Sequence, residues 1–173
     1  MNYADVIKKL VNIDGDPEEE LELMDYLGDG SYGVVYKALH KQSGKMVAVK
    51  LIPLAKFDHI ETCIKEMEIL AHCKSEFIVS YITSYYKENN LWIVMEYCGG
   101  GSVKDIIRIT KQPFEDENII KNLMFPILRG LQYLHTNKTI HRDIKADNIL
   151  LNDIGDVKLA DFGVSAKLMT TYG

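Results

Sequence analysis

The stretch His141-Arg142-Asp143-Ile144-Lys145-Ala146-Asp147-Asn148, followed by Asp161-Phe162-Gly163, decides how this chain is interpreted. It places an aspartate, a lysine, an asparagine and a second aspartate in a fixed order. Phosphoryl transfer needs a carboxylate to orient a hydroxyl, a cation to neutralise phosphate, and oxygen ligands for Mg²⁺. These two segments supply each of those groups, so they point to phosphoryl-transfer chemistry.

The composition describes an ordinary globular protein that is not built to bind nucleic acid. The chain has 173 residues, of which 47% are hydrophobic and 26% charged, and a net charge of −5. Length alone predicts one domain. A negative net charge disfavours binding to a phosphate backbone, which needs a basic face. No apolar run approaches the roughly 20 residues that span a bilayer, and residues 1–5 lack the features of a signal peptide.

The cysteines favour a reducing compartment. Cys63, Cys73 and Cys98 are an odd, sparse set without CxxC spacing, which is typical neither of a disulfide framework nor of a zinc site. The five histidines form no HExxH or clustered pattern. We therefore expect reduced thiols and a cytoplasmic protein.

The first half of the chain reads as a β-rich region preceded by a leader. Residues 3–13 predict an amphipathic helix, and the acidic run 14–20 predicts a solvated linker. From Leu21 onwards, β-rich runs at 21–27, 34–36 and 46–49 predict three antiparallel strands, with a turn at 42–45.

A helix and two further strands are expected next. Asp58 and Glu61 form a capping-box pattern at the start of the helix. Its buried stripe is predicted from residues at helical spacing: Ile60, Ile64, Met67 and Ala71. Strands are expected around 78–86 and 91–96, joined by a tight turn at Asn89-Asn90.

The second half is predicted to be mainly helical. Gly99-Gly100-Gly101 suggests a hinge, followed by a short helix at 103–109 and a long one at 115–135 that Pro126 should kink. The inner face of the long helix is predicted to comprise Ile119, Leu123, Ile127, Leu131 and Leu134. Short strands are expected at 149–151 and 157–159.

A glycine-rich segment lies between the first two predicted strands. Gly28-Asp29-Gly30-Ser31-Tyr32-Gly33-Val34-Val35 fits GxGxxGxV. A lone GxGxxG can be a chance turn or a dinucleotide fingerprint, but the fingerprint leads into a helix. Here a β-rich run follows, which favours a hairpin tip whose backbone amides approach phosphate. Tyr32 would lie at this tip, either as a flap or simply as an exposed turn aromatic.

Lys50 ends the run Val47-Ala48-Val49-Lys50. In isolation it would be read as an exposed lysine at a strand end, but beside the glycines it becomes a candidate ligand of the α- and β-phosphates. Glu66 is the preferred carboxylate partner because it lies beside the predicted inward face of its helix. Glu61 and Glu68 compete for this assignment.

From about Leu21 to Lys167 the chain resembles a eukaryotic protein kinase. The glycine segment, the Val-Ala-Val-Lys run and both segments quoted first occur in the order of that family. Ile144-Lys145 is similar to the serine/threonine class. Residues 91–103 and 141–148 resemble the germinal-centre/Hippo-type branch of the sterile-twenty-like kinases.

The resemblance implies roles for particular residues. Asp143 would orient the substrate hydroxyl, Lys145 would neutralise the γ-phosphate, and Asn148 and Asp161 would hold Mg²⁺. His141 and Phe162 would pack rather than react. The resemblance also implies an ATP site formed by the glycine segment with Lys50. The purine would contact the side chains of Leu27, Val35, Ala48 and Leu150, with Met95 as the gatekeeper. Glu96 and Cys98 would contact adenine through their backbone, and a ribose contact is implied near Ser102.

The implied fold is α+β and two-lobed. A leader and linker (1–20) would precede an N-lobe with a five-stranded antiparallel sheet (21–98) and the incomplete helical C-lobe (99–173). The kinase pattern would continue past Gly173 through an activation loop, an Ala-Pro-Glu element and further helices. Because those helices would cover the 115–135 helix, we expect the 173-residue chain alone to have an ordered N-lobe and a poorly held C-lobe.

The implied function is ATP- and Mg²⁺-dependent transfer of phosphate to serine or threonine of protein substrates in intracellular signalling. Val164 suggests a threonine preference. A dimer or scaffold partner could bind through regions outside this chain. The alternative is a non-catalytic nucleotide-binding or interaction module, and loss of Lys50, Asp143 or Asp161 would have favoured it. All three are present.

Overall fold

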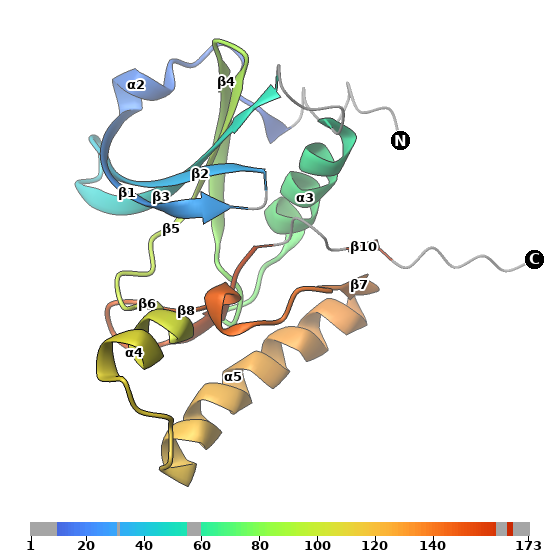
Figure 1. Cartoon of the computed structure of the whole chain (residues 1–173). Helices are drawn as coiled ribbons and strands as arrows, with labels where there is room; N and C mark the ends of the chain where they lie inside the picture. Colours follow the sequence, from blue (N-terminus) through green and yellow to red (C-terminus); the bar gives the residue numbers. More distant parts are fainter. Residues whose placement is uncertain (1–9, 31, 55–59, 162–165, 168–173) are drawn as a thin grey trace, which may run out of the picture. The chain divides into compact units, whose positions relative to one another are not determined.

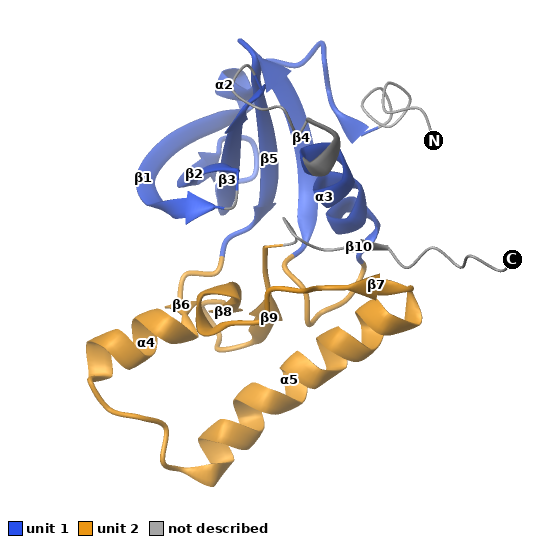
Figure 2. Cartoon of the chain, turned by 45° about the vertical axis from the view of Figure 1, so that its right-hand side comes forward, with its two compact units in different colours: residues 1–73, 80–97 blue, residues 74–79, 98–173 orange. Residues whose placement is uncertain are grey.

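The computed structural model describes residues 10–30, 32–54, 60–161 and 166–167, and for 60–62 and 166–167 only the backbone (Figure 1). The chain forms two compact units (Figure 2). Unit 1 comprises residues 1–73 and 80–97, and unit 2 comprises residues 74–79 and 98–173. Residues 74–79 thus join unit 2, although the sequence suggests a single boundary near residue 98. In the described part of the chain, no helix combines the length and apolarity needed to cross a bilayer.

Unit 1 is built on the expected five-stranded antiparallel sheet. Its strand order is β1-β2-β3-β5-β4, and every neighbouring pair is antiparallel. The strands are β1 (Leu21–Gly30), β2 (Gly33–His40), β3 (Lys45–Pro53), β4 (Tyr81–Lys87) and β5 (Asn90–Glu96). The α+β prediction with this sheet is therefore confirmed.

The turn between β4 and β5 lies one residue earlier than predicted. Lys87 pairs with Asn90, so Glu88 and Asn89 are its two central residues. Their φ angles are 51° and 62°. Two positive φ angles match the twist of antiparallel strands in a two-residue hairpin. The Asn89-Asn90 assignment was wrong because Asn90 begins β5.

The two faces of the sheet bury different partners. One face carries an apolar cluster comprising Leu21, Ala38, Val47, Val49, Tyr85, Trp92 and Val94. On the other face lies helix α3 (Ile60–His72). Its predicted stripe is buried at Ile64 and Met67 and half-buried at Ala71. Asp58 and the side chains of Ile60 and Glu61 lie outside the described residues, so the capping box stays a prediction.

The N-terminal segment follows β4 instead of continuing a helix. Residues 3–9 lie outside the described part, but the predicted helix is wrong at residues 11–13. The Asn12 N–H donates to the Ser84 carbonyl at 2.8 Å, and Asn12 forms a parallel bridge with Tyr85. Helix α2 (Pro17–Glu20) then interrupts the predicted linker, since Asp16 caps it and Pro17 fits its first turn.

The predicted strand at 78–86 begins only at Tyr81. Ile78 forms a parallel bridge with Leu159, and the Val79 N–H donates to the Leu159 carbonyl at 2.9 Å. Ile78 and Val79 are buried by this pairing in unit 2. Their apolar pattern therefore reflects burial beside Leu159 and not membership of β4.

Unit 2 combines two helices with short strands. The helices are α4 (Val103–Thr110) and α5 (Glu117–Thr136), with a 3₁₀ turn η2 (Ala146–Asn148). One sheet has the order β6-β8-β9, and a second pairs β10 with β7. These strands are β6 (Gly101–Ser102), β7 (Thr139–Ile140), β8 (Ile149–Leu151), β9 (Val157–Leu159) and β10 (Ala166–Lys167). Both strands predicted at 149–151 and 157–159 are confirmed.

The buried face of α5 is shorter than predicted. Ile127 and Leu134 are buried as expected, and Leu123 and Leu131 are half-buried, but Ile119 is 45% exposed. Gly130 is buried, and Leu159 packs so closely against it that an added Cβ would lie 2.9 Å from Leu159 Cδ1. α5 runs through Pro126 as one helix. Exposed apolar side chains line its first half: Ile119, Ile120, Met124, Phe125 and Leu128.

Candidate active site

Lys50 and Glu66 form a buried ion pair inside unit 1. Lys50 lies on β3 between Val35 of β2 and Ile93 of β5, so its backbone is fixed on both sides. Its Nζ lies 2.6 Å from Oε1 of Glu66 on α3, and both side chains are 5% exposed. Charges removed from water to this degree require a close partner. The structure thus brings together the lysine and the carboxylate that the sequence analysis preferred.

The glycine-rich hairpin tip packs against the same lysine. Gly30 and Gly33 pair across the end of β1 and β2. A Cβ at Gly33 would lie 2.0 Å from the Leu51 carbonyl oxygen, so only glycine fits there. A Cβ at Gly30 would lie 3.0 Å from Lys50 Cε. Closeness of a backbone loop to a lysine is the arrangement that a phosphate site needs.

The other residues of the glycine segment are placed as follows. Gly28 pairs with Val35, and Asp29 with Val34. Asp29 is exposed and Tyr32 is half-buried. Ser31 lies outside the described residues, so its phosphate contact stays a prediction.

One face of the sheet also gathers the expected purine contacts of unit 1. Val35 pairs with Lys50, and Ala48 pairs with Met95. Since paired residues and alternate strand residues point to the same side, these four side chains share a face. Leu27 on β1 is 45% exposed. The Glu96 N–H donates to the Ser80 carbonyl at 2.8 Å, so Glu96 has a backbone partner within the unit.

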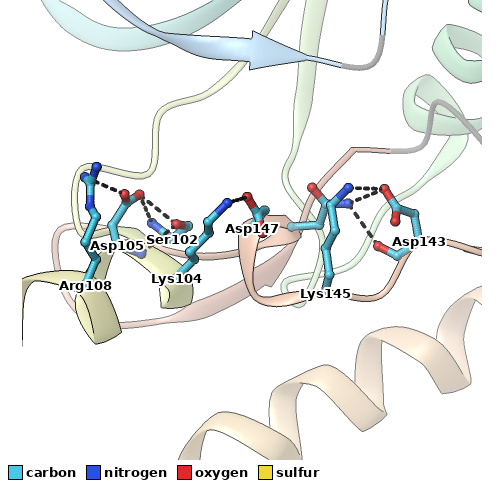
Figure 3. Close-up of polar contacts among 8 residues, drawn as sticks. Ser102, Lys104, Asp105, Arg108, Asp143, Lys145 and Asp147 are labelled. Carbon is cyan, nitrogen blue, oxygen red and sulfur yellow. Dashed lines mark hydrogen bonds and ion pairs between the residues drawn. The ribbon is translucent and has the colours of Figure 1, made fainter. Parts of the chain in front are cut away.

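In unit 2 the Asp143 carboxylate is held by two neighbouring side chains (Figure 3). Lys145 Nζ lies 2.7 Å from Asp143 Oδ2, and Asn148 Nδ2 donates to Oδ2 and to the Asp143 carbonyl, each at 2.9 Å. The hydrogen bond to Asp143 raises the pKa of Lys145. The side chains of Lys145 and Asp143 are 49% and 30% exposed. A carboxylate, an ammonium group and an amide therefore meet at one accessible point.

Buried His141 holds the loop that carries Asp143 by hydrogen bonds. It is 1% exposed, and burial lowers its pKa. Neutral His141 donates from Nε2 to the Ala160 carbonyl at 3.0 Å and accepts the Asp143 N–H at Nδ1 at 3.3 Å; the tautomer is assigned from these partners. The Ala160 N–H in turn donates to the Asn148 carbonyl at 2.9 Å. These bonds bring the backbone before Asp161 to the loop that carries Asp143 and Asn148.

The donor set suits Mg²⁺ shared with phosphates. Asn148 uses Nδ2 toward Asp143, so its oxygen Oδ1 would be the ligating atom, with the carboxylate of Asp161. Within the described residues, no group of three or more His, Cys, Asp or Glu could enclose a metal. Mg²⁺ commonly takes only one or two protein ligands and completes its shell with phosphates and water.

Ser102 and Leu150 are paired, and the Ser102 side chain caps helix α4. The two residues pair between β6 and β8. The Ser102 hydroxyl accepts the Asp105 N–H at 3.0 Å and donates to Asp105 Oδ2 at 2.6 Å, which caps α4 (Figure 3). This bond lowers the pKa of Asp105. Cys98 is 9% exposed, and its carbonyl accepts the Gly101 N–H at 3.1 Å.

One contact next to the site has no signature in the sequence. Lys104 of α4 and Asp147 of η2 form an ion pair at 2.5 Å, which ties α4 to the residue before Asn148 (Figure 3). The pair lowers the pKa of Asp147. The partners are 43 residues apart in sequence, and no local pattern links them.

The buried lysine–glutamate pair beside the glycine hairpin in unit 1 and the Asp-Lys-Asn loop in unit 2 are the features from which a phosphoryl-transfer protein was expected. Residues 21–172 match the protein kinase domain, and the chain belongs to this family. The family predicted from the motifs is therefore confirmed.

Two curated relatives share about half of its residues. The chain is 50% identical over 155 residues to the serine/threonine-protein kinase cst-1 of Caenorhabditis briggsae and 49% identical to that of Caenorhabditis elegans. Each match covers 90% of this chain and 31% of the relative. The chain thus spans about a third of the relatives it matches, and both are of the serine/threonine class that Ile144-Lys145 suggested.

Proposed function

We propose that this chain carries the nucleotide-binding and phosphoryl-transfer residues of a protein serine/threonine kinase. The observation that supports this best is the cluster of Lys145 and Asn148 on the Asp143 carboxylate. A carboxylate held by an amide, with a half-exposed cation at the same oxygen, can accept a hydrogen bond from a serine or threonine hydroxyl and orient it toward phosphorus.

The proposed steps use both units. Lys50, held by Glu66, binds the α- and β-phosphates of ATP under the glycine hairpin. Asp143 orients the acceptor hydroxyl and takes its proton as the bond to the γ-phosphorus forms and the bond to the β-phosphate oxygen breaks. Lys145 neutralises charge on the transferred group. Mg²⁺, when bound through Asn148 and Asp161, would neutralise the β- and γ-phosphates.

The finer parts of the proposal rest on the sequence. We propose protein substrates with a preference for threonine from Val164, which lies outside the described residues. A role in intracellular signalling in the cytoplasm, and a dimer or scaffold partner, follow from the resemblance.

Transfer of radiolabelled phosphate to a generic basic protein tests the proposal. The protein should be made as encoded, with any sequence that follows Gly173, and compared with Asp143→Asn. Loss of the base is expected to lower kcat by about 10²–10⁴-fold. The affinity for Mg²⁺–ATP, measured by calorimetry, should not change. Equal counts from both proteins would overturn catalysis and favour the nucleotide-binding module. Failure to bind Mg²⁺–ATP would overturn both.

A further inference from the structure

Residues 10–20, called here the N-terminal strap, cover the edge of the unit 1 sheet. They precede the residues that match the protein kinase domain. β4 is the last strand in the order β1-β2-β3-β5-β4, so one side of it is open to another segment. The strap pairs with this edge of β4. Asn12 forms a bridge with Tyr85, and the Asn12 N–H donates to the Ser84 carbonyl at 2.8 Å. Val11 beside it is 6% exposed.

A buried hydroxyl connects the strap to helix α3. Ser84 is fully buried, and its Oγ donates to the Leu10 carbonyl at 2.8 Å. The same Oγ lies 3.4 Å from Sδ of Met67 on α3. Tyr81 adds a bond of 3.0 Å from its hydroxyl to the Leu10 carbonyl. One strap carbonyl is therefore fixed by two β4 side chains, one of which touches α3.

The other end of the strap is fixed by charge. Lys87 Nζ lies 2.7 and 2.8 Å from the two oxygens of Asp16 and also pairs with Glu18. The hydrogen bond to Asp16 contributes most to raising the pKa of Lys87, and the same bond lowers that of Asp16. Tyr85 donates from its hydroxyl to Glu20 at 2.8 Å. Four residues of β4 thus bind the strap at different points along the strand: Tyr81, Ser84, Tyr85 and Lys87.

Met67 is the next residue after Glu66, the partner of Lys50. It is fully buried against Ser84, so a shift of Met67 moves the backbone that carries Glu66. A buried ion pair depends strongly on close geometry, because displaced charges lose their attraction but remain out of water. The path from strap to active site is therefore Leu10, Ser84, Met67 and Glu66.

We propose that the N-terminal strap is a positioning element for phosphoryl transfer: through Ser84 and Met67 it holds Glu66 against Lys50. The predicted effect on phosphate transfer rests on the proposed kinase function, whereas the predicted effect on hydrogen exchange of α3 does not. Removal of the strap leaves the β4 edge and the Ser84 hydroxyl without these partners. α3 then has fewer contacts that fix its position on the sheet.

Hydrogen exchange tests the structural part in the protein as encoded, including any sequence after Gly173. Ser84→Ala and Lys87→Met loosen the strap at its two ends. Tyr86→Phe is the matched control, since it removes a β4 hydroxyl that bonds to Asn89 and not to the strap. α3 amides should exchange about five- to tenfold faster in both strap variants, with β1–β3 and the control unchanged. Unchanged exchange of α3 would overturn the proposal.

A double-mutant cycle separates positioning from general stability. Lys87→Met should lower kcat/KM about fivefold when Glu66 is present and have no effect in a Glu66→Gln background, because the strap acts through that carboxylate. Equal losses in both backgrounds would overturn the proposal. Absence of transfer by the unaltered protein would contradict the kinase function alone, and the exchange result would still decide the role of the strap.

Discussion

The two units each hold a lysine against a carboxylate, at almost the same distance but in opposite surroundings. Lys50 and Glu66 are 2.6 Å apart and 5% exposed, whereas Lys145 and Asp143 are 2.7 Å apart and 49% and 30% exposed. The buried pair is part of the architecture of unit 1, since neither charge can leave without cost. The exposed pair can open to admit other charges. Similar bonds therefore form a buried, fixed pair in one unit and an accessible pair in the other.

Breaking the buried pair should have the largest effect on stability. Lys50→Met leaves the Glu66 carboxyl group in the interior without its lysine, which is expected to lower the free energy of unfolding by about 3–5 kcal/mol. Denaturant unfolding of unit 1, followed by the fluorescence of Trp92, measures this loss.

Two controls sharpen the same comparison. Lys145→Met should leave the unfolding midpoint almost unchanged, because water replaces the exposed lysine. The double variant Lys50→Met/Glu66→Leu should recover most of the lost stability, since both charges are gone. A similar loss for Lys50→Met and Lys145→Met would show that burial does not distinguish the two pairs.

The units should also differ in local stability, as the sequence suggested. Unit 1 covers its sheet with α3 and the strap, whereas α5 of unit 2 exposes Phe125 and Leu128 at 60% and 57%. In the 173-residue chain we expect amides of α5 to exchange at least about tenfold faster than those of β3 and β5. Equal protection in both units, measured by hydrogen exchange, would refute this.

A smaller effect is expected at the start of α4. Ser102→Ala removes the hydroxyl that caps the helix and leaves the Asp105 N–H unpaired, which should cost about 1 kcal/mol. Ser102→Thr keeps an oxygen in place and should cost much less. Thermal unfolding of both variants checks the order, and a more stable Ala variant would contradict the capping role.

The smallest effect expected is a pH dependence from His141. Its pKa in the folded protein is lowered by burial, so the unfolded chain binds the proton more readily. Neutral His141 therefore contributes fully to the free energy of unfolding above the ordinary histidine pKa of about 6.5. This contribution is lost as the pH falls below that value. Unfolding between pH 7.5 and 5 should show a drop that is shallower in His141→Gln. If the free energy of unfolding depends on pH equally in both proteins, His141 is not the cause of the drop.

Local patterns predicted what depends on neighbouring residues. The strands 149–151 and 157–159 and the five-stranded sheet follow from β-rich runs separated by turn residues. The preference for Glu66 followed from helical periodicity, and the structure places it on Lys50. In each case the sequence within one or two elements determines which side chain faces inward.

Long-range contacts account for the differences. Ile78 and Val79 look like part of a β4 strand, but their partner is Leu159, about 80 positions later. Gly130 is buried because Leu159 approaches it, which no helical pattern reveals. Lys104 and Asp147, like the strap and β4, meet only after the chain has folded.

The close fit of Gly33 limits how the hairpin can be engineered. The obstacle to any side chain there is the main-chain carbonyl of Leu51, and no rotamer change can move a carbonyl that is fixed in a strand. A fluorescent label that tests for the proposed nucleotide binding should instead be attached at Asp29, which is exposed near the same tip. The hairpin thus offers one position for a reporter beside another that rejects every side chain.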